Sequence, residues 1–514
     1  MEKRGVKLKK QVKFTKTSGF FVLKPPKHFT VPLLTGGGDQ SDRVVNIGDK
    51  VCEGSLIAKP VGKYGSFIYS PCSGKVVGVV RKLNARGYEC DHVVITRDLE
   101  EDREYLKPLD VNQFSQEFLL KRVYESGLVD NFEPYDPTYK KYLLKNPIKT
   151  LVVNCCEDDP YVISTSVLID NYVGEIVEGA KYLKIVAQAN EIVFTITTKQ
   201  RAIYKKLNSH IKNLGDKNIK IKVMPDIYPL NHPRIMSYYI TGKMVADGQR
   251  TAITNVIVES ANNCYDFYNA VNLGMPAIQR AVTVAGDNCI RKANYFIKNG
   301  TSISHVLDVV TVRDGQDNKL VYGGIMTGIA QENLDISVSL DATAILFCNN
   351  NEVEVNMESA CINCGKCNEC CPVRLNVKEL DQIFYTRDYS RAKNLGCETC
   401  IKCGACSYIC PAKRYLTQRV SFMKDYVSGK RAKNPSSGEY VLIEGESGIE
   451  NESLKDKISL SAVKFESVEK NDNINEIEQM LSRLEDVRHY NEREKQAQEW
   501  NKQNGVNADN GGEK

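Results

Sequence analysis

The chain has 514 residues, 42% of them hydrophobic, which is enough for about three or four domains with buried cores. The formal net charge is only +5, and basic residues are not interleaved with aromatic ones, which argues against a dedicated nucleic-acid-binding protein. No run of 18 apolar residues occurs, so we expect no transmembrane segment of the chain's own.

The chain begins with a basic segment and continues into a β-rich region. Residues 1–17 are rich in lysine, and we expect a flexible lead-in. Over residues 18–105, the strings GDKVCEGSLIAKP and SPCSGKVVGVV resemble the barrel-sandwich hybrid of biotinyl and lipoyl domains. Such carriers hold a modified lysine at a hairpin tip, but Lys63 in VGKYGS lacks the flanking residues of a modification site. We therefore favour an unmodified structural barrel over a biotin or lipoyl carrier.

The rest of the chain divides into four further regions, which together predict an α+β multidomain protein. Strand-like and helical stretches alternate over residues 106–273, which predicts a layered α/β domain, and residues 274–348 predict a compact β-grasp (SLBB-like) module. Residues 349–425 are rich in cysteine, and VKELDQIFYTRDYSRAKNLG within them predicts one helix. Residues 426–514 form a polar tail, with an amphipathic helix predicted over about 474–490.

Two copies of one cysteine motif lie in the last third of the chain. Residues 361–372 are CINCGKCNECCP and residues 400–411 are CIKCGACSYICP, and each contains C-x2-C-x2-C-x3-C-P, which is typical of [4Fe–4S] ligation. Zinc also binds C-x2-C pairs, but a repeated triple followed by a distant C-P favours iron–sulfur clusters. The other cysteines show no disulfide-scaffold spacing and no secretory signal precedes them, so we expect a reducing, cytoplasmic location.

The proline fixes the register of each motif, because it follows the last ligand. In paired motifs of this kind the fourth cysteine ligates the other cluster. The spare thiols are then Cys370 and Cys397. One predicted [4Fe–4S] cluster is held by Cys361, Cys364, Cys367 and Cys410, and the second by Cys400, Cys403, Cys406 and Cys371.

Over residues 18–420 the chain resembles the RnfC family, one of the components of the Rnf (Rsx) electron-transport complex. The resemblance rests on both cysteine motifs and on the strings KPPKH, PCSGKV, NCCEDDPY, YITGK and YGGIMTG, in that order. It implies a peripheral subunit on the cytoplasmic face of the membrane, which exchanges electrons with NAD(H) through FMN and passes them along two [4Fe–4S] clusters. Its implied partners are the other subunits of a membrane-bound complex and ferredoxin or a ferredoxin-like subunit. The complex would act as an ion-translocating ferredoxin:NAD oxidoreductase.

The chain departs from this family at a glycine-rich loop. Relatives carry a loop close to G-L-G-G-A-G-F-P-T, but residues 127–138 here are GLVDNFEPYDPT, and of the loop glycines only Gly127 remains. In a typical member the acidic strand end, here Glu157, Asp158 and Asp159, would contact flavin or ribose; capping of the next helix is the alternative. Two hypotheses follow: a subunit with its own FMN and NAD(H) site, or a paralogue that has lost both and acts as a relay or adaptor. No arrangement of catalytic nucleophile and base is predicted.

Overall fold

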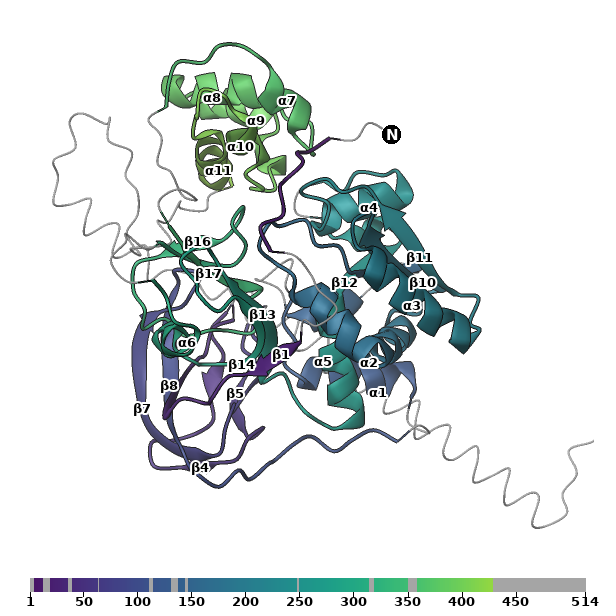
Figure 1. Cartoon of the computed structure of the whole chain (residues 1–514), viewed down its shortest axis with the longest axis vertical. Coiled ribbons are helices and arrows are strands. Elements are labelled where there is room, and N and C mark those ends of the chain that lie inside the picture. Colours follow the sequence, from purple (N-terminus) through teal and green to yellow (C-terminus); the bar gives the residue numbers. More distant parts are fainter. Residues whose placement is uncertain are drawn as a thin grey trace, which may run out of the picture.

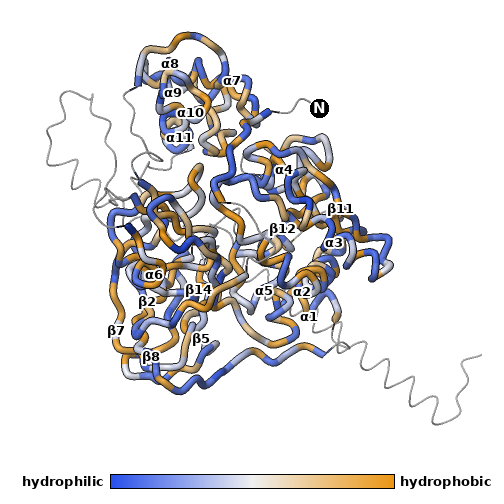
Figure 2. The backbone as a smooth tube through the Cα atoms, viewed as in Figure 1, coloured by the Kyte–Doolittle hydropathy of each residue, from blue (hydrophilic) through white to orange (hydrophobic). Residues whose placement is uncertain are grey.

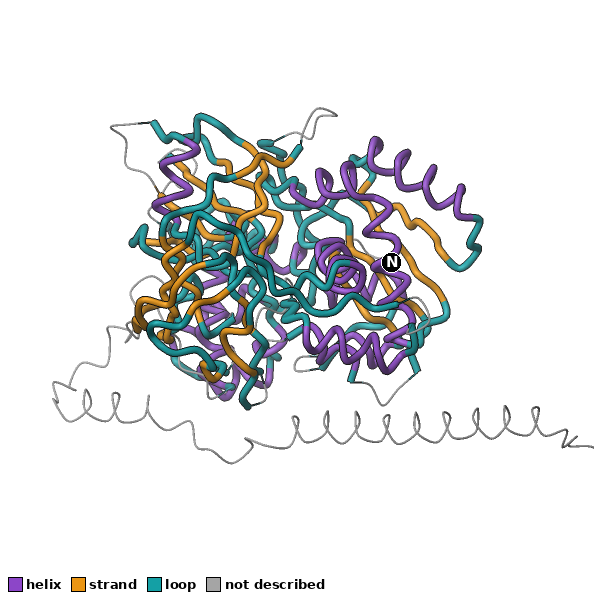
Figure 3. Tube along the Cα trace, turned by 90° about the horizontal axis from the view of Figure 1, so that it is seen from below, coloured by secondary structure: helices purple, strands orange, loops and turns teal. Residues whose placement is uncertain are grey.

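A computed structural model describes residues 4–12, 19–35, 39–62, 64–110, 114–130, 137–143, 147–246, 249–313, 319–349 and 358–428. Figure 1 shows a helical part that contains α7 to α11 next to two larger parts. Figure 3 shows that one of these is rich in strands and that helices cover the sheet of the other. Lys63 and the predicted helix over 474–490 lie outside the described residues. No helix among those residues is long and apolar enough to span a membrane.

The barrel domain is built from two small antiparallel sheets. Their strand orders are β2-β8-β7-β4 and β3-β5-β6. Phe29, Val31, Ile57 and Ile95 form the fully buried centre, because alternate residues of β2 and β8 point inward. The strands are β2 (His28–Pro32), β3 (Asp42–Arg43), β4 (Lys50–Val51), β5 (Leu56–Lys59), β6 (Ile68–Tyr69), β7 (Gly74–Leu83) and β8 (Glu89–Arg97).

The α/β domain is a four-stranded parallel sheet with the order β11-β10-β9-β12. The strand β9 is buried along its whole length, as expected for a strand covered by helices on both faces. Figure 2 shows hydrophobic residues along α2, which packs on this sheet and on α5. The elements are α1 (Gln116–Glu125), η2 (Thr138–Tyr142), β9 (Thr150–Asn154), α2 (Ser164–Ala187), β10 (Glu191–Thr197), α3 (Arg201–Leu214), β11 (Ile219–Met224), α4 (Pro233–Thr241), η3 (Thr251–Thr254), β12 (Val256–Ser260) and α5 (Ala261–Asn272).

The mixed-sheet domain follows, with the strand order β1-β14-β13-β17-β15-β16. The predicted boundary at residue 18 assigned β1 to the barrel, but this strand pairs in parallel with β14 and Phe20 stacks on Phe296 with ring centroids 4.3 Å apart. This long-range pairing has no local signal in the sequence. The elements are β1 (Phe20–Val22), β13 (Gln279–Ala285), β14 (Ala293–Lys298), α6 (Ile303–Val310), β15 (Lys319–Tyr322), β16 (Ile329–Gln331) and β17 (Ala344–Cys348).

The cysteine domain, residues 358–428, is helical. The helix predicted over residues 377–396 is broken: Arg387 adopts a left-handed conformation with φ of 56°, and the side chain of Asp388 accepts a hydrogen bond from Arg391 N to cap a new helix. The elements are α7 (Lys366–Cys370), α8 (Val377–Thr386), α9 (Tyr389–Asn394), η4 (Cys397–Thr399), α10 (Ala405–Ile409) and α11 (Leu416–Val427).

The N-terminal segment differs from the flexible lead-in that its composition predicts. In Figure 1 the start of the chain runs between the cysteine domain and α4. Val6 forms a β-bridge with Tyr228, and Val6 and Leu8 are 4% and 8% exposed. Burial of these two apolar side chains offsets the entropy lost on ordering the segment.

Candidate functional site

The two cysteine motifs share one backbone geometry. Asn363 and Lys402 have φ of 59° and 54°, and Gly365 and Gly404 have φ of 75° and 80°. These pairs are 39 residues apart, as are the motifs themselves. The left-handed residues curl each loop tightly before a short helix begins, α7 or α10, and so bring cysteines that are three residues apart to the inside of the loop.

Four thiols from both motifs surround one pocket. The cavity contains about 340 Å³ of space free of atoms, part of it open to solvent. Its cysteines are the four assigned to the second cluster, Cys371, Cys400, Cys403 and Cys406, and its other walls are mostly apolar, including Val373, Leu375, Val377, Ile401 and Val420. The structure therefore brings Cys371 of the first motif together with three cysteines of the second, as a swapped fourth ligand requires.

Electrostatics at the pocket shows how close these thiols lie. Burial raises the pKa of the Cys406 thiol to about 12, and the neighbouring Cys400 and Cys371 raise it further. Leu375 N lies 3.3 Å from Cys371 Sγ, Lys402 N lies 3.4 Å from Cys400 Sγ, and Thr417 Oγ1 lies 3.2 Å from Cys406 Sγ. Donors aimed at sulfur are the contacts that stabilise thiolate ligands of an iron–sulfur cluster.

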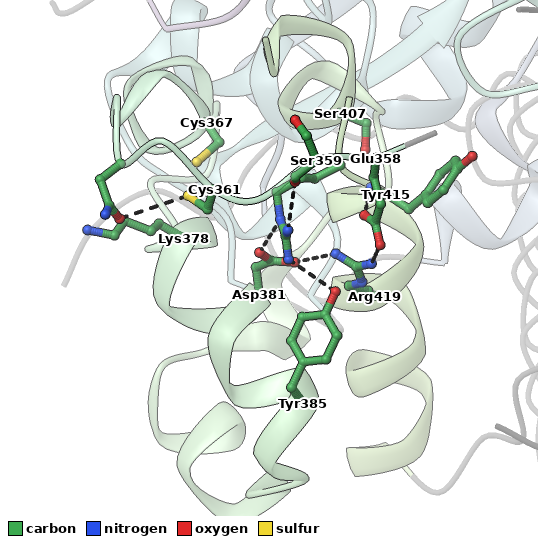
Figure 4. Close-up of polar contacts among 12 residues, drawn as sticks. Glu358, Ser359, Cys361, Cys367, Lys378, Asp381, Tyr385, Ser407, Tyr415 and Arg419 are labelled. Carbon is green, nitrogen blue, oxygen red and sulfur yellow. Dashed lines mark hydrogen bonds and ion pairs between the residues drawn. The ribbon is translucent and has the colours of Figure 1, made fainter. Parts of the chain in front are cut away.

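The other predicted ligand set lies nearer the surface. Cys361 and Cys364 are exposed, whereas Cys367 and Cys410 are half-buried. Burial raises the pKa of Cys367 to about 11, with further contributions from Cys410 and Cys361, so these three thiols are neighbours. Figure 4 shows the Cys361 and Cys367 side chains near one another. Three of the four predicted ligands are therefore brought together, and Cys364 lies on the exposed loop between Cys361 and Cys367.

The two cysteines predicted to be spare are both buried. Cys397 belongs to the hydrophobic core of the cysteine domain and is fully buried. Cys370 Sγ lies 3.5 Å from Cys367 O, and its thiol interacts electrostatically with Cys406, Cys371 and Cys367. Cys370 thus lies between the two ligand sets.

A buried ion network holds the scaffold around these cysteines. Asp381 in α8 accepts hydrogen bonds from Arg414 Nε at 2.8 Å and from Arg419 Nη1 at 2.7 Å (Figure 4). Arg419 also pairs with Glu358, and Arg414 Nη2 donates to Tyr385 Oη at 3.1 Å. The network ties the start of the domain, α8 and α11 to one another.

The donor set fits [4Fe–4S] clusters. Within the described ranges, no group of three or more His, Cys, Asp or Glu side chains is arranged to hold a single metal ion. In a cubane each cysteine binds a different iron, and the thiols of the pocket correspondingly surround a space. When bound, such a cluster stores and releases one electron at a time.

The three acidic candidates for flavin contact lie at the carboxyl edge of the α/β sheet and bond within the protein. Glu157 accepts hydrogen bonds from Ser166 N at 2.7 Å and Ser166 Oγ at 2.6 Å. Asp158 Oδ2 accepts from Asn231 N at 2.9 Å, and Asp159 accepts from Tyr161 N at 3.0 Å. Burial raises the pKa of Asp158 to about 7 and that of Asp159 to about 6.

The remnant of the glycine-rich loop makes other contacts. Gly127 has φ of 67°, and a Cβ there would lie 2.5 Å from the carbonyl oxygen of Phe67 in the barrel domain. Asp130 is fully buried and its Oδ2 lies 2.7 Å from Lys141 Nζ. Gly127 thus allows close approach to the barrel, and Asp130 brings a negative charge into an ion pair. The described residues do not fit the phosphate of a flavin here.

Several features of the site were missed by sequence reasoning. The sulfur contact of Thr417 and the Asp381 network join segments far apart in the chain and leave no local signal. The packed N-terminal segment did leave one, since Val6 and Leu8 alternate with lysines as in a half-buried strand.

Known protein families match three separate parts of the chain. Residues 2–100 match the family described as RnfC barrel sandwich hybrid domain. Residues 123–269 match the Nuo51 FMN-binding domain, and residues 354–411 match the 4Fe-4S dicluster domain. These matches confirm the predicted barrel, the flavoprotein-type α/β domain and the iron–sulfur domain.

One curated relative and two solved structures are similar to the chain. The C component of the ion-translocating oxidoreductase complex of Citrobacter koseri is 26% identical over 357 residues, which are 68% of this chain and 50% of the relative. The chain therefore spans about half the length of this relative. Two crystal structures of NAD+-reducing [NiFe]-hydrogenase, in the H2-reduced and air-oxidized states, are 12% and 11% identical with TM-scores of 0.43 and 0.41. Each alignment covers 62% of this chain and 55% of the hydrogenase chain. The order of the three matched domains and the curated relative together show that the chain is RnfC-like.

Proposed function

We propose that the chain is the electron-transfer subunit of a membrane-associated Rnf-type oxidoreductase complex and carries single electrons through two [4Fe–4S] clusters. One observation supports this most strongly: four cysteines from two motifs line one pocket with mostly apolar walls. A dry, thiol-lined pocket suits a redox cluster, because burial and hydrogen bonds to sulfur set its potential.

The two ligand sets face different surroundings, which gives the proposed path a direction in space. Cys403 and Cys406 pack against Val6 and Tyr228 near the α/β domain. Cys361 and Cys364 are exposed. The second cluster would exchange electrons inside the subunit, and the first would exchange them with a docked partner, either ferredoxin or another subunit.

The role of the complex follows from the curated relative, whose name describes an ion-translocating oxidoreductase. We extend this to the chain: it would attach peripherally to membrane subunits on the cytoplasmic face, in a complex that couples electron transfer between ferredoxin and NAD to ion translocation. A flavin is the group that converts hydride transfer from NADH into single-electron steps. A chain without flavin would receive single electrons from a partner, as a relay or adaptor.

The domain plan is part of the proposal. We assign residues 18–105, 106–273, 274–348 and 349–425 to the barrel, α/β, β-grasp (SLBB-like) and dicluster domains, and residues 426–514 to a polar tail. The β-grasp assignment is supported by the order of β14, β13, β17 and β15 and by α6, which follows β14 in the chain. In the mixed sheet, β13 and β17 pair in parallel at the centre.

Paired cysteine variants test the clusters and their swapped ligands. The anaerobically reconstituted full chain should contain about eight iron atoms and a reducible paramagnetic centre. Cys371→Ala combined with Cys400→Ala should leave about four irons, because both side chains belong to one cluster. Cys371→Ala combined with Cys361→Ala should remove both clusters.

The control is Cys397→Ala, which removes a buried thiol of the same domain and should keep about eight irons. If the two double variants show the opposite pattern, each motif holds its own cluster and the ligand assignment is wrong. If the wild-type chain binds no iron but binds zinc, the electron-transfer function is wrong. A flavin assay on the same sample distinguishes a subunit that contains flavin from a relay.

A further inference from the structure

The N-terminal residues 4–12, which we call the strap, cross the carboxyl edge of the α/β sheet. In open α/β sheets ligands bind outside the carboxyl ends of the strands. The family that matches this domain is described as FMN-binding, so this edge is where a flavin is expected. In this chain β9 and β11 end here, and the loops that follow them contain Pro160 and Tyr228.

Backbone hydrogen bonds fix the strap at both of these loops. Val6 N donates to Tyr228 O at 2.9 Å, and Tyr228 N donates to Val6 O at 2.8 Å. Further along, Gln11 N and Val12 N both donate to Pro160 O, at 2.9 and 3.3 Å. The strap is therefore held at its two ends by main-chain contacts, like a short added strand.

Side chains of the strap fill the space that these contacts enclose. Val6 and Leu8 are buried in a cluster with Tyr228, Cys370 and Ala405, which joins the α/β domain to the cysteine domain. Lys10 Nζ donates to Asp159 O at 2.6 Å. The ammonium also lies close enough to lower the pKa values of Glu157, Asp158 and Asp159 against the larger effect of burial. The strap supplies both the apolar contact and the positive charge at this edge.

The β12 side of the same edge is occupied by a second group of this chain. Lys141 Nζ lies 2.7 Å from Asp130 Oδ2 and 3.2 Å from Glu259 Oε1, and Tyr142 Oη donates to Glu259 Oε2 at 3.1 Å. Glu259 belongs to β12, and both carboxylates are fully buried. Internal groups thus neutralise the charges on both sides of the edge.

We propose that the strap is the built-in occupant of this edge and takes the place of FMN, so that protein alone joins the α/β domain to the cysteine domain. The proposal deepens the proposed function by assigning this subunit the relay role. It is tested independently of the clusters, because strap seating and flavin binding are measured separately from iron content.

A glycine substitution displaces the strap without deleting it. A Cβ on Gly5 would lie 2.2 Å from Tyr228 O and 2.9 Å from Ile227 Cγ1, so Gly5→Val cannot keep the Val6–Tyr228 pairing. Gly19→Val is the matched control, because a Cβ there meets nothing within 4 Å. A second variant, Lys10→Glu, removes the hydrogen bond to Asp159 and adds a like charge. All are made in the full, iron-loaded chain.

Hydrogen exchange of the peptide covering residues 4–12 reports on the strap, and flavin retained after desalting from excess FMN reports on the edge. We expect the wild type and Gly19→Val to protect the peptide and to retain no FMN. Protection should fall about tenfold or more in Gly5→Val, since two backbone hydrogen bonds are lost, and should also fall in Lys10→Glu.

Two results would overturn the proposal. One is a wild-type chain that retains about one FMN. The other is a wild-type strap that exchanges as fast as the strap in Gly5→Val. Iron content measured on the same samples separates these results from a failure of the cluster assignment, since loss of iron alone would leave the strap proposal standing.

Discussion

At the residue scale, Thr417 is placed to set the potential of the second cluster. Its Oγ1 lies 3.2 Å from Cys406 Sγ and accepts a hydrogen bond from Ser407 Oγ at 3.0 Å, which leaves its proton for the sulfur. A donor to a thiolate stabilises the reduced, more negative cluster. We predict that Thr417→Val lowers one reduction potential by about 30–60 mV, because one hydrogen bond contributes about 1 kcal/mol and 59 mV corresponds to tenfold for one electron.

The measurement is a redox titration followed by paramagnetic resonance. Thr386→Val is the matched control, since Thr386 Oγ1 donates to Ile383 O in the same domain and contacts no thiol that the structure describes. Equal potentials in Thr417→Val and Thr386→Val would show that the hydroxyl does not contact the cluster.

Asp158 carries a pH dependence of stability. Aspartate has a pKa of about 3.9 in an unfolded chain. Burial raises the pKa of Asp158 to about 7 in the fold, against the hydrogen bond from Asn231 and the charge of Lys10; the neighbouring Asp159 raises it further. The folded state therefore binds the proton more tightly, and this stabilisation is complete below pH 4 and is lost as pH rises through 7.

Asp158→Asn keeps the shape and has no proton to lose. We predict that it is more stable than the wild type at pH 8, and that this difference shrinks by about 2–3 kcal/mol at pH 5. Denaturant midpoints at the two pH values measure this. Asp49→Asn, at an exposed site, is the control for removing a carboxylate. A difference that stays constant with pH would contradict the prediction.

At the scale of elements, Asp381 joins α8 to α11. The side chains of Arg414 and Arg419 are 11% and 10% exposed, and both donate to this carboxylate. We predict that Asp381→Ala destabilises the cysteine domain by about 3 kcal/mol, because it leaves buried guanidinium groups without a partner charge. Faster hydrogen exchange in α8 and α11 would show this.

The control for Asp381→Ala is Glu379→Ala, which breaks the pair with Arg391, whose side chain is 60% exposed. An exposed pair contributes about 0–1 kcal/mol, so this variant should exchange nearly as the wild type does. Equal exchange in the two variants would mean that the buried network does not stabilise the domain.

Elements were predictable where one local pattern decided them. Runs such as Thr150–Asn154 and Glu191–Thr197 are apolar strands between helical stretches, and they form adjacent parallel strands. The break at Arg387 was missed, because apolar spacing continues across it and only the cap by Asp388 ends the pattern. β1 was placed in the wrong domain, because its partner lies more than 270 residues away.

The candidate site was predictable only in part, for the same reason. The spacing of the cysteines predicted the set Cys371, Cys400, Cys403 and Cys406, which the structure brings to one pocket, because these ligands are fixed by covalent spacing and a repeat. The strap and the Lys141 ion pairs depend on contacts between distant segments. Composition alone made residues 4–12 look like a solvated basic tail.

At the scale of the whole molecule, the cysteine domain is attached to the α/β domain beside the inner ligand set. Tyr228 Oη donates to Cys403 O at 2.5 Å, Arg234 Nη1 donates to Thr399 O at 3.3 Å, and Arg374 Nη2 donates to Tyr238 Oη at 3.1 Å. The strap adds Val6 and Leu8 to this contact. The attachment therefore orients the exposed cysteines, Cys361 and Cys364, away from the joint.

The large domains and the cysteine domain should respond differently to loss of iron. The barrel, α/β and mixed-sheet domains each have a hydrophobic core of their own. In the cysteine domain α7 and α10 have only five residues each, and Cys371 and Cys397 are part of its small core. Helices this short are not stable alone, and ligand binding by a metal centre becomes folding free energy.

We therefore predict that removing iron with a chelator under anaerobic, reducing conditions unfolds residues 366–427 selectively. Hydrogen exchange there should rise by orders of magnitude, while β9 and β10 keep their protection. The strap should loosen at Val6 and Leu8, which pack on the cysteine domain, and stay bound at Gln11, which bonds to Pro160. Unchanged protection of α8 and α11 after complete loss of iron would show that the Asp381 network and the apolar core suffice to hold the domain without clusters.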